Sequence, residues 1–306
     1  MKRVWYCIGV LVFISLALTS CSKQVSGGKI ENHTTWQMEE TICQGMKKAE
    51  AEAEAVEKAK EEAAKKTEAE AQAKKEQETV GNQVPKVEAI PGQHRDPNSA
   101  VVVIDPGHQL RGDSTKEPNG PGSSTMKARV TGGATGVATG VAEYVMNLNV
   151  SLKLKTELEN RGYTVYMTRS THDVNISNKE RAEYATSVGA DIAVRIHGNG
   201  STNSSVRGAE CYAPSGQNPY VGHLAKASQS LSRCIVDAYS AATGFKNRGV
   251  FTSDTMTGIN WSTVPVTIIE LGYMSNPEED RNMQNETIQN NMVQGIANGI
   301  DAYFGF

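Results

Sequence analysis

The stretch Ala100-Val-Val-Val-Ile-Asp-Pro-Gly-His108 opens the apolar part of this 306-residue chain and indicates its fold class. The uninterrupted apolar run 100–104 is typical of a strand that is buried on both faces of a parallel sheet. Further strand candidates and helical patterns alternate with one another downstream. The strands are expected at 163–168, 191–197, 208–212, 249–251 and 264–270, and the helices at 141–158, 224–238 and 288–300. This order predicts an α/β fold of three layers, with a mostly parallel twisted sheet of about six strands flanked by helices.

The N-terminus has a different character. Met1-Lys2-Arg3 precedes an apolar run from Val4 to Leu18, which is the pattern of a secretory signal peptide. The run is shorter than the roughly 20 residues of a membrane-spanning helix. It ends in Leu18-Thr19-Ser20-Cys21, which resembles a lipobox, so we expect a lipoprotein signal peptide at 1–20 and lipidation at Cys21. The alternatives are an ordinary signal peptide and an uncleaved anchor.

Residues 21–99 read as a tether and linker. From about Gln37 to Val80 the chain is mostly Ala, Glu and Lys, residues that enter a helix at little cost. Large apolar residues are nearly absent, so a coiled coil is not predicted. The segment is expected to be non-globular, either a solitary helix or a disordered charged spacer. Prolines and glycines near Pro85 and Pro91 end it before the body, 100–306, begins.

Composition excludes several classes of protein. The formal net charge is -3, so the overall charge gives no indication of nucleic-acid binding. The five cysteines contain no CxxC pair, which argues against a zinc ribbon and a dense disulfide scaffold. A disulfide between Cys211 and Cys234 is compatible with export, and the sequence leaves it open.

Chemically active side chains stand at the ends of three predicted strands. His108 follows the first, His197 follows the third and Glu270 lies at the end of the last. In open α/β sheets, ligands bind outside the carboxyl ends of the strands. Glu143 opens the first long helix and can approach the same edge. Two imidazoles and a carboxylate are a ligand set for catalytic zinc, and a further carboxylate beside the zinc site can act as a general base.

Seven motifs in a fixed order carry a family resemblance over about 101–306. They are DPGH (105–108), a Glu that opens a helix (143), TRSTHD (168–173), KERAEYATSVGAD (179–191), IHGN (196–199), GAE (208–210) and IIELGYMSNPEED (268–280). This order resembles the zinc-dependent N-acetylmuramoyl-L-alanine amidases of the amidase-3 type. The resemblance implies a mostly parallel sheet flanked by helices, and cleavage of the amide bond between N-acetylmuramic acid and L-alanine in peptidoglycan.

The same resemblance implies a role for each site residue. His108, Glu143 and His197 would bind Zn²⁺, and Glu270 would be the catalytic carboxylate. Because the loop 109–139 is long, Glu117 is a competing ligand. Glu143 is preferred because its helix continues with Asn-Leu at 147–148, as the family's helix does.

The chain departs from the family pattern in three motifs. Gln109-Leu110 stand where Gly-Gly is common, Arg195 and Gly198 where serine and alanine are common, and Thr186 where asparagine is usual. None of them removes a proposed ligand, so they bear on substrate fit more than on metal binding.

The expected protein is thus an exported zinc amidase, held by a lipid anchor at the membrane or envelope and facing the cell wall. Its partners are peptidoglycan and the membrane, with no nucleic acid. Two alternatives stay open: a zinc peptidase or amidase acting on another envelope substrate, and a non-catalytic wall-binding protein that kept the fold.

Overall fold

The computed structural model describes residues 99–306; the predicted signal peptide, Cys21 and the tether lie outside them, apart from Ser99. None of the helices described is long and apolar enough to cross a membrane. The strands are β1 (Val101–Pro106), β2 (Asp113–Pro118), β3 (Met126–Val130), β4 (Thr164–Met167), β5 (Ile192–Asn199), β6 (Ala209–Ala213), β7 (Asn247–Thr252) and β8 (Val266–Tyr273). The helices are α3 (Glu143–Asn160), α4 (Asn178–Ser187), η2 (Gly222–Leu224), α5 (Ala225–Thr243), α6 (Thr257–Asn260), α7 (Pro277–Gln284) and α8 (Glu286–Phe304).

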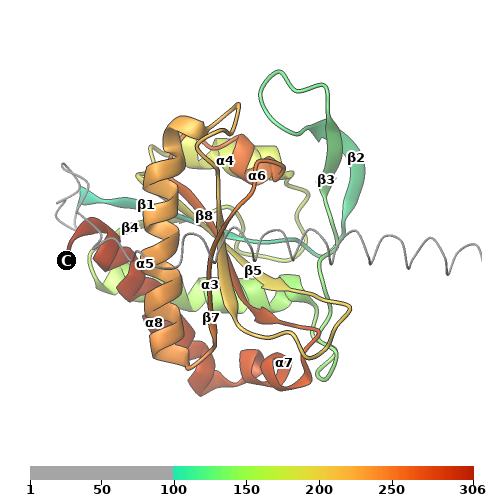
Figure 1. The fold of residues 1–306 in the computed structure, drawn as a ribbon, viewed down its shortest axis with the longest axis vertical. Helices are drawn as coiled ribbons and strands as arrows, with labels where there is room; N and C mark the ends of the chain where they lie inside the picture. Colours follow the sequence, from blue (N-terminus) through green and yellow to red (C-terminus); the bar gives the residue numbers. More distant parts are fainter. Residues whose placement is uncertain (1–98) are drawn as a thin grey trace, which may run out of the picture. The chain divides into compact units, whose positions relative to one another are not determined.

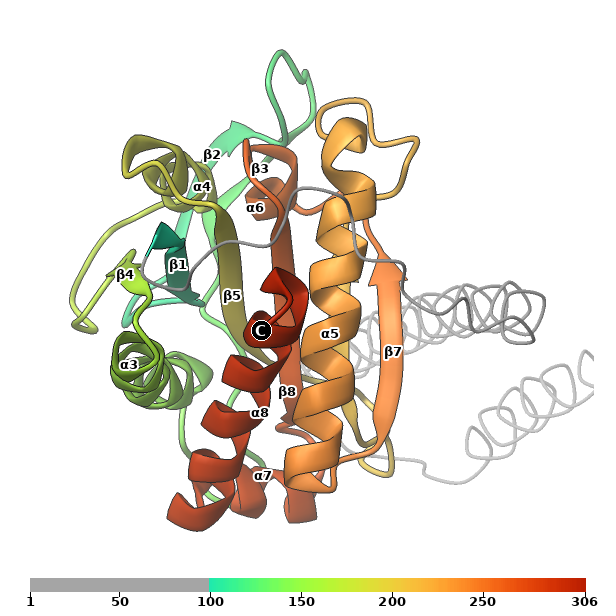
Figure 2. The same cartoon turned by 90° about the vertical axis from the view of Figure 1, so that its left-hand side faces the viewer.

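Six strands form one sheet in the order β4-β1-β5-β8-β6-β7 (Figures 1 and 2). All pairs are parallel except β6 with β8, which is antiparallel. Each strand overlaps a segment that the apolar pattern predicted, and the prediction of a mostly parallel six-stranded sheet is confirmed.

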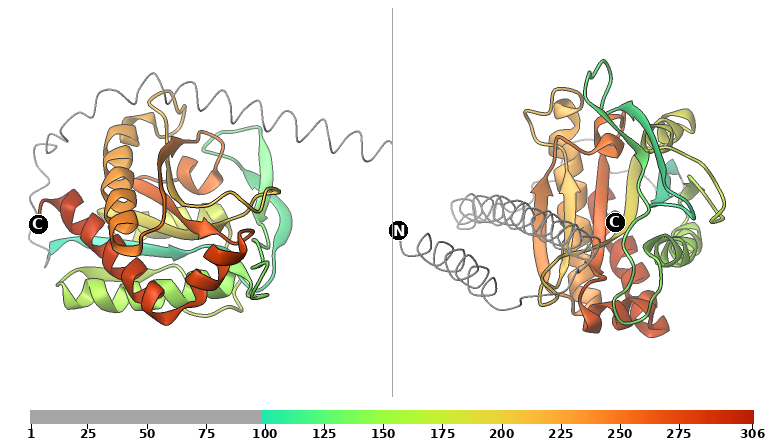
Figure 3. Two further views of the ribbon diagram at one scale, coloured as in Figure 1. Left: turned by 60° about the horizontal axis from the view of Figure 1, so that its bottom comes forward. Right: turned by 90° about the vertical axis from the view of Figure 1, so that its right-hand side faces the viewer.

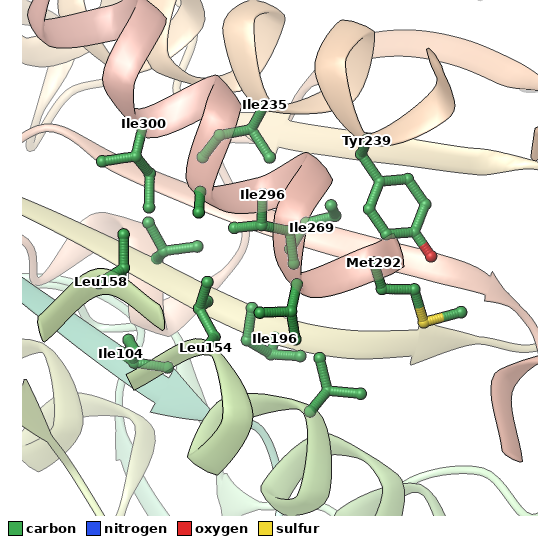
Figure 4. Close-up of a cluster of buried hydrophobic side chains, with 14 of the residues drawn as sticks. Ile104, Leu154, Leu158, Ile196, Ile235, Tyr239, Ile269, Met292, Ile296 and Ile300 are labelled. Carbon is green, nitrogen blue, oxygen red and sulfur yellow. The ribbon is translucent and has the colours of Figure 1, made fainter. Parts of the chain in front are cut away.

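Helices cover the two faces of the sheet unequally (Figure 3). Helices α3 and α5 pack directly on one face, and α8 packs between them as an outer element. Apolar side chains from all three helices and from β1, β5 and β8 form the main core, part of which is drawn in Figure 4. A smaller core on the other face involves α4 and α6. The sheet is therefore the middle of three layers.

Side-chain alternation assigns the functional strand ends to one of these faces. On β5, Ile192, Val194 and Ile196 belong to the main core, whereas Ala193 belongs to the smaller one. His197 has the same parity as Ala193. Successive strand residues point to opposite faces, so His197 is directed to the α4/α6 face. The same argument places Glu270 there, because Val266 and Ile268 of β8 lie in the smaller core.

Some elements differ from the expectation. The segment 109–139, expected to be a loop, contains the two-stranded antiparallel sheet β2–β3. The sequences of these two strands lack the alternation of apolar and polar residues that would have predicted them. Helices α4, α6 and α7 were not among the predicted helices, whereas the helix predicted at 288–300 is α8, which Asn285 starts by accepting a hydrogen bond from the Ile288 amide. Helix α5 ends at Gly244, whose φ of 75° lies in the left-handed region that glycine adopts easily.

Candidate active site

His108 leaves the end of β1 with an unusual backbone conformation. Its φ of 57° lies in the left-handed region, where side chains other than glycine are uncommon. Such a conformation persists only when the surroundings enforce it. The backbone carbonyl of Thr131, just after β3, accepts a hydrogen bond from His108 Nδ1 at 2.9 Å. Because a carbonyl oxygen can only accept, this bond places a proton on Nδ1, and in the neutral imidazole Nε2 then has the lone pair that a metal ion can take.

The carboxylate of Glu143 faces this lone pair. Glu143 is the first residue of α3, where a negative charge is favourable. Its Oε1 lies 3.1 Å from His108 Nε2 and 3.2 Å from His197 Nδ1. The Gly198 amide also donates to Oε1, and the Ala134 amide donates to Oε2 at 2.7 Å. The carboxylate is thus held between the two imidazoles.

The electrostatic surroundings of these side chains agree with this arrangement. Burial opposes ionisation of Glu143, but the hydrogen bonds and charges of His108 and His197 hold its pKa well below the usual range. Burial lowers the pKa of His197, although the hydrogen bond that this ring donates to Glu143 acts in the opposite direction. Near neutral pH the site therefore contains an ionised carboxylate beside a neutral His197 imidazole, which is the protonation state that a metal ligand needs.

The donor set fits a divalent metal ion. One ligand atom from each of His108, Glu143 and His197 lies within 4.8 Å of the others. His108 Nε2 and Glu143 Oε1 lie 3.1 Å apart, close enough to share one cation, either a proton or a metal ion. The Nε2 atom of His197 is buried and has no hydrogen-bond partner among residues 99–306. Two imidazoles and a carboxylate match catalytic zinc sites, which leave a fourth position to water.

Glu270 stands on the strand next to His197. The two residues are in register on the parallel pair β5–β8, so their side chains lie on the same face of the sheet. Within the described part of the chain, Glu270 Oε2 is buried and has no hydrogen-bond partner. Burial, together with the charges of Glu143 and Glu210, raises the pKa of Glu270 well above its ordinary value. A carboxyl group in this state has the proton affinity that general acid–base chemistry requires.

Two glycines make this close packing possible. A Cβ on Gly107 would lie 2.3 Å from Cε1 of the His197 ring, so any larger residue there would displace the imidazole. Gly133 has a φ of 81°, and its Cβ would lie 2.9 Å from Glu143 Oε2. The DPGH motif therefore needs its glycine for contact with a histidine far away in the sequence.

A buried cluster of charged side chains holds the C-terminal end of β1. Asp105 accepts hydrogen bonds from Arg181 Nη1 and Arg195 Nε, both at 2.7 Å. Burial raises the pKa of Asp105, but the two guanidinium groups outweigh it and hold this pKa below the usual range. Arg181 also donates to the carbonyl of His108 at 3.0 Å, and Arg169 to that of Gly107. The backbone that carries His108 is thus clamped by arginines.

Two departures from the family pattern take part in this support. Arg195 pairs with Asp105 and donates to Asn178 Oδ1. Gln109 is buried, and its Oε1 accepts from Arg181 Nη2 and from the Ile176 amide. Both side chains therefore bond to the protein's own framework. The third departure, Thr186, contacts Thr263 through their hydroxyl groups.

Other predicted residues lie away from the site. Glu117, the competing ligand, is on β2, and its carboxylate accepts a hydrogen bond from the Lys179 amide in the first turn of α4. Cys211 and Cys234 both have free thiols. The sequence did not indicate Thr131, because its contribution is a backbone carbonyl, which does not depend on the residue type. It also did not indicate that Arg169 and Arg181 would bind the backbone at Gly107 and His108.

Comparison with known proteins agrees with this site. Residues 102–302 match the family model Amidase_3, described as N-acetylmuramoyl-L-alanine amidase. The uncharacterized protein YqiI of Bacillus subtilis is 30% identical over 159 residues, which cover 52% of this chain and 73% of YqiI. The amidase AmiC of Neisseria meningitidis is 23% identical, and the match covers 70% of this chain and 55% of AmiC. The chain thus spans little more than half the length of AmiC.

Solved structures share the fold. The catalytic domain of CwlV, an N-acetylmuramoyl-L-alanine amidase from Bacillus (Paenibacillus) polymyxa, is 29% identical with a TM-score of 0.54; the match covers 67% of this chain and 97% of that domain. The amidase Ami1 of Mycobacterium smegmatis has a TM-score of 0.62 at 22% identity, covering 69% of this chain and 99% of Ami1. With its body matched almost end to end, the chain belongs to the amidase-3 family and is a hydrolase of the N-acetylmuramoyl-L-alanine amidase type.

Proposed function

We propose that this protein is a zinc-dependent amidase that cleaves the bond between N-acetylmuramic acid and the L-alanine of the stem peptide in peptidoglycan. The observation that carries the proposal is the convergence of His108, Glu143 and His197 on one point, with ligand atoms within 4.8 Å of one another. Glu270 stands on the adjacent strand in register with His197. Family membership supports the same reaction.

The three converging residues would hold the ion, and the framework around them determines their orientation. The Thr131 carbonyl fixes the His108 ring, while the Gly198 and Ala134 amides fix the Glu143 carboxylate. Such outer contacts keep ligands in the geometry that binding needs. When bound, Zn²⁺ supplies Lewis acidity for the amide carbonyl and lowers the pKa of a water molecule to about 7.

Glu270 moves the proton in this mechanism. Its carboxylate accepts a proton from the attacking water, whose oxygen forms a bond to the lactyl carbonyl carbon. The carbon–nitrogen bond then breaks, and the nitrogen of L-alanine takes the bonding electron pair and the proton from Glu270. The products are a free lactyl carboxyl group and a free amino-terminal alanine. The buried position of Glu270, which raises its pKa, suits a group that holds a proton between the two steps.

Substitution of Glu270 by Gln tests the mechanism. The variant should release stem peptide from purified peptidoglycan at least about 1,000-fold more slowly, because the amide cannot accept the proton. Its zinc content, measured by atomic emission, should equal that of the wild type. His197→Ala is the matched control and should lose both zinc and activity. Full activity of Glu270→Gln would remove this residue from the mechanism.

Product analysis separates the proposal from the two alternatives. An amidase generates amino-terminal alanine and a free muramyl lactyl carboxyl group. A zinc peptidase acting on another envelope bond would generate a different amino terminus. A wall-binding protein without catalysis would bind sacculi and release nothing, with zinc present or absent.

We propose further that residues 1–20 are a lipoprotein signal peptide, that Cys21 carries the lipid and that 21–99 form a tether to the amidase domain 100–306. Lipid anchoring would keep the enzyme at the membrane or envelope, within reach of the wall, because each buried CH₂ contributes about 0.8 kcal/mol. Cys21→Ala should move the protein from the membrane fraction to the soluble fraction. A Cys21→Ala protein that stays in the membrane fraction would contradict lipid anchoring.

A further inference from the structure

The row of functional side chains continues beyond Glu270. Glu210 of β6 is paired in register with Glu270 of β8, so both side chains lie on the same face of the sheet. Glu210 is only 2% exposed. Its Oε1 accepts hydrogen bonds from Asn199 Nδ2 at 2.7 Å and from the Tyr212 hydroxyl at 2.8 Å.

The second oxygen of Glu210 is also fully engaged. Oε2 accepts from Arg248 Nε at 2.5 Å and from the Tyr273 hydroxyl at 3.1 Å. A carboxylate with four donors has no free lone pair for substrate or proton transfer. Glu210 therefore has a positioning role, and the group that it positions is the guanidinium of Arg248.

Arg248 is anchored at one end only. Its Nε bonds to Glu210, whereas Nη1 and Nη2 have no hydrogen-bond or ion-pair partner within 99–306. The Tyr273 ring lies 5.3 Å from the guanidinium carbon and supports it from one side. A Cβ on Gly208 would lie 2.9 Å from Arg248 Cγ, so glycine at 208 leaves room for the arginine stem. The Arg248 side chain is 28% exposed.

The surroundings of Arg248 suit a substrate subsite. Helix α5 packs against β6 and β7 on the face away from Glu270. In the right-hand view of Figure 3, β7, β6 and β8 face the viewer and α5 lies behind them. Adjacent strands are about 4.8 Å apart, and the Arg248 guanidinium reaches Glu210 of β6, the strand next to β8. The guanidinium therefore lies on the order of 5–10 Å from the Glu270 carboxylate. This separation is comparable to the roughly 7 Å that two extended residues of a bound peptide span.

We infer that Arg248 is a specificity-determining residue, which binds the free α-carboxylate of the stem-peptide residue that follows L-alanine. The two unpartnered terminal nitrogens match a carboxylate bidentately, and Glu210 orients them in advance. This inference rests on the proposed amidase function and assigns it a substrate class: stem peptides whose second residue carries a free carboxylate, in preference to amidated ones.

The experiment compares two soluble substrates that differ in one group. One is N-acetylmuramoyl-L-alanyl-γ-D-glutamyl-L-lysine, and the other is the same molecule with the glutamyl α-carboxylate converted to the amide. The zinc-loaded wild type should favour the free acid in kcat/KM by about 10- to 100-fold, the value of a charge-assisted bidentate contact. Arg248→Gln should lose this preference, mainly through a higher KM for the free acid.

Two further variants control the interpretation. Arg248→Lys keeps the positive charge but lacks the two parallel N–H donors of the guanidinium, so it should retain part of the preference for the free acid. Arg233→Gln removes one positive charge from the exposed surface of α5 and should behave like the wild type. The zinc content and the Tm of Arg248→Gln, compared with those of the wild type, show whether the variant is folded and loaded.

The outcomes distinguish this inference from the proposed function. If the wild type cleaves both substrates equally, or if Arg248→Gln slows both by the same factor, Arg248 does not read the carboxylate and the inference is wrong. If the wild type cleaves neither substrate, the proposed amidase function fails and the inference falls with it.

Discussion

His197 and Glu270 occupy registered positions on the neighbouring parallel strands β5 and β8. This pairing places an imidazole and a buried carboxyl group side by side on the α4/α6 face of the sheet. Because both residues belong to regular strands, their separation is determined by the sheet and not by a loop. Rigid elements hold functional groups more accurately than loops do.

Gly107→Ala should weaken zinc binding although it alters no proposed ligand. The new methyl group would lie 2.3 Å from His197 Cε1 and would push the ring out of place. Zinc affinity, measured by competition with a chromogenic chelator, should fall at least about 10-fold. Gly216→Ala is the control, because a Cβ there meets nothing within 4 Å. Equal zinc affinities in the two variants would show that Gly107 is not needed for this packing.

Zinc should stabilise the folded protein. Ligands that bind the native state and not the unfolded state add about 2.7 kcal/mol at a concentration of 100 Kd. The Tm of the chelator-treated wild type should therefore rise on addition of zinc, whereas that of His108→Ala should not. A Tm of the wild type that is indifferent to zinc would argue against the site itself.

Stability should decline in acid through Asp105. Burial raises the pKa of this carboxyl, but the charges of Arg181 and Arg195 dominate, so its pKa in the folded state lies below the ordinary 3.8. A lowered pKa contributes stability that is complete above the ordinary value and is lost as the pH falls toward the folded-state pKa. The free energy of unfolding, from urea titrations, should therefore decrease below about pH 5.

Asp105→Asn tests this assignment. At neutral pH the variant should be less stable by about 3–5 kcal/mol, because two buried guanidinium groups lose their counter-charge. Its stability should also depend less on pH in the acid range than that of the wild type. Parallel acid profiles for the two proteins would assign the acid sensitivity to other carboxylates.

Gly299→Ala should destabilise the domain, against the usual effect of this substitution in a helix. Alanine is normally favoured over glycine in a helix interior by about 1 kcal/mol. Here a Cβ on Gly299 of α8 would lie 2.5 Å from the Ile235 Cα of α5, where only backbone can yield. Forced overpacking costs about 1–3 kcal/mol, which a lower Tm would report. A raised Tm would mean that the two helices separate without cost.

The sequence alone was sufficient to predict the sheet. A strand such as 100–104, buried on both faces, must be apolar throughout, and this requirement is visible without coordinates. The strand ends at His108, His197 and Glu270 could also be predicted to share an edge, since parallel strands bring their carboxyl ends together. The order of the seven motifs along the chain also pointed to the family.

Only the tertiary structure decided how these residues act together. The hairpin β2–β3 carries no apolar alternation, so its existence and the contact of the Thr131 carbonyl with His108 depend on packing. Arg248 is separated from Glu210 by 38 residues, and their hydrogen bond exists because β6 and β7 pair in parallel. Residue types and spacing specify which elements form, whereas the contacts between side chains from distant elements depend on how those elements pack.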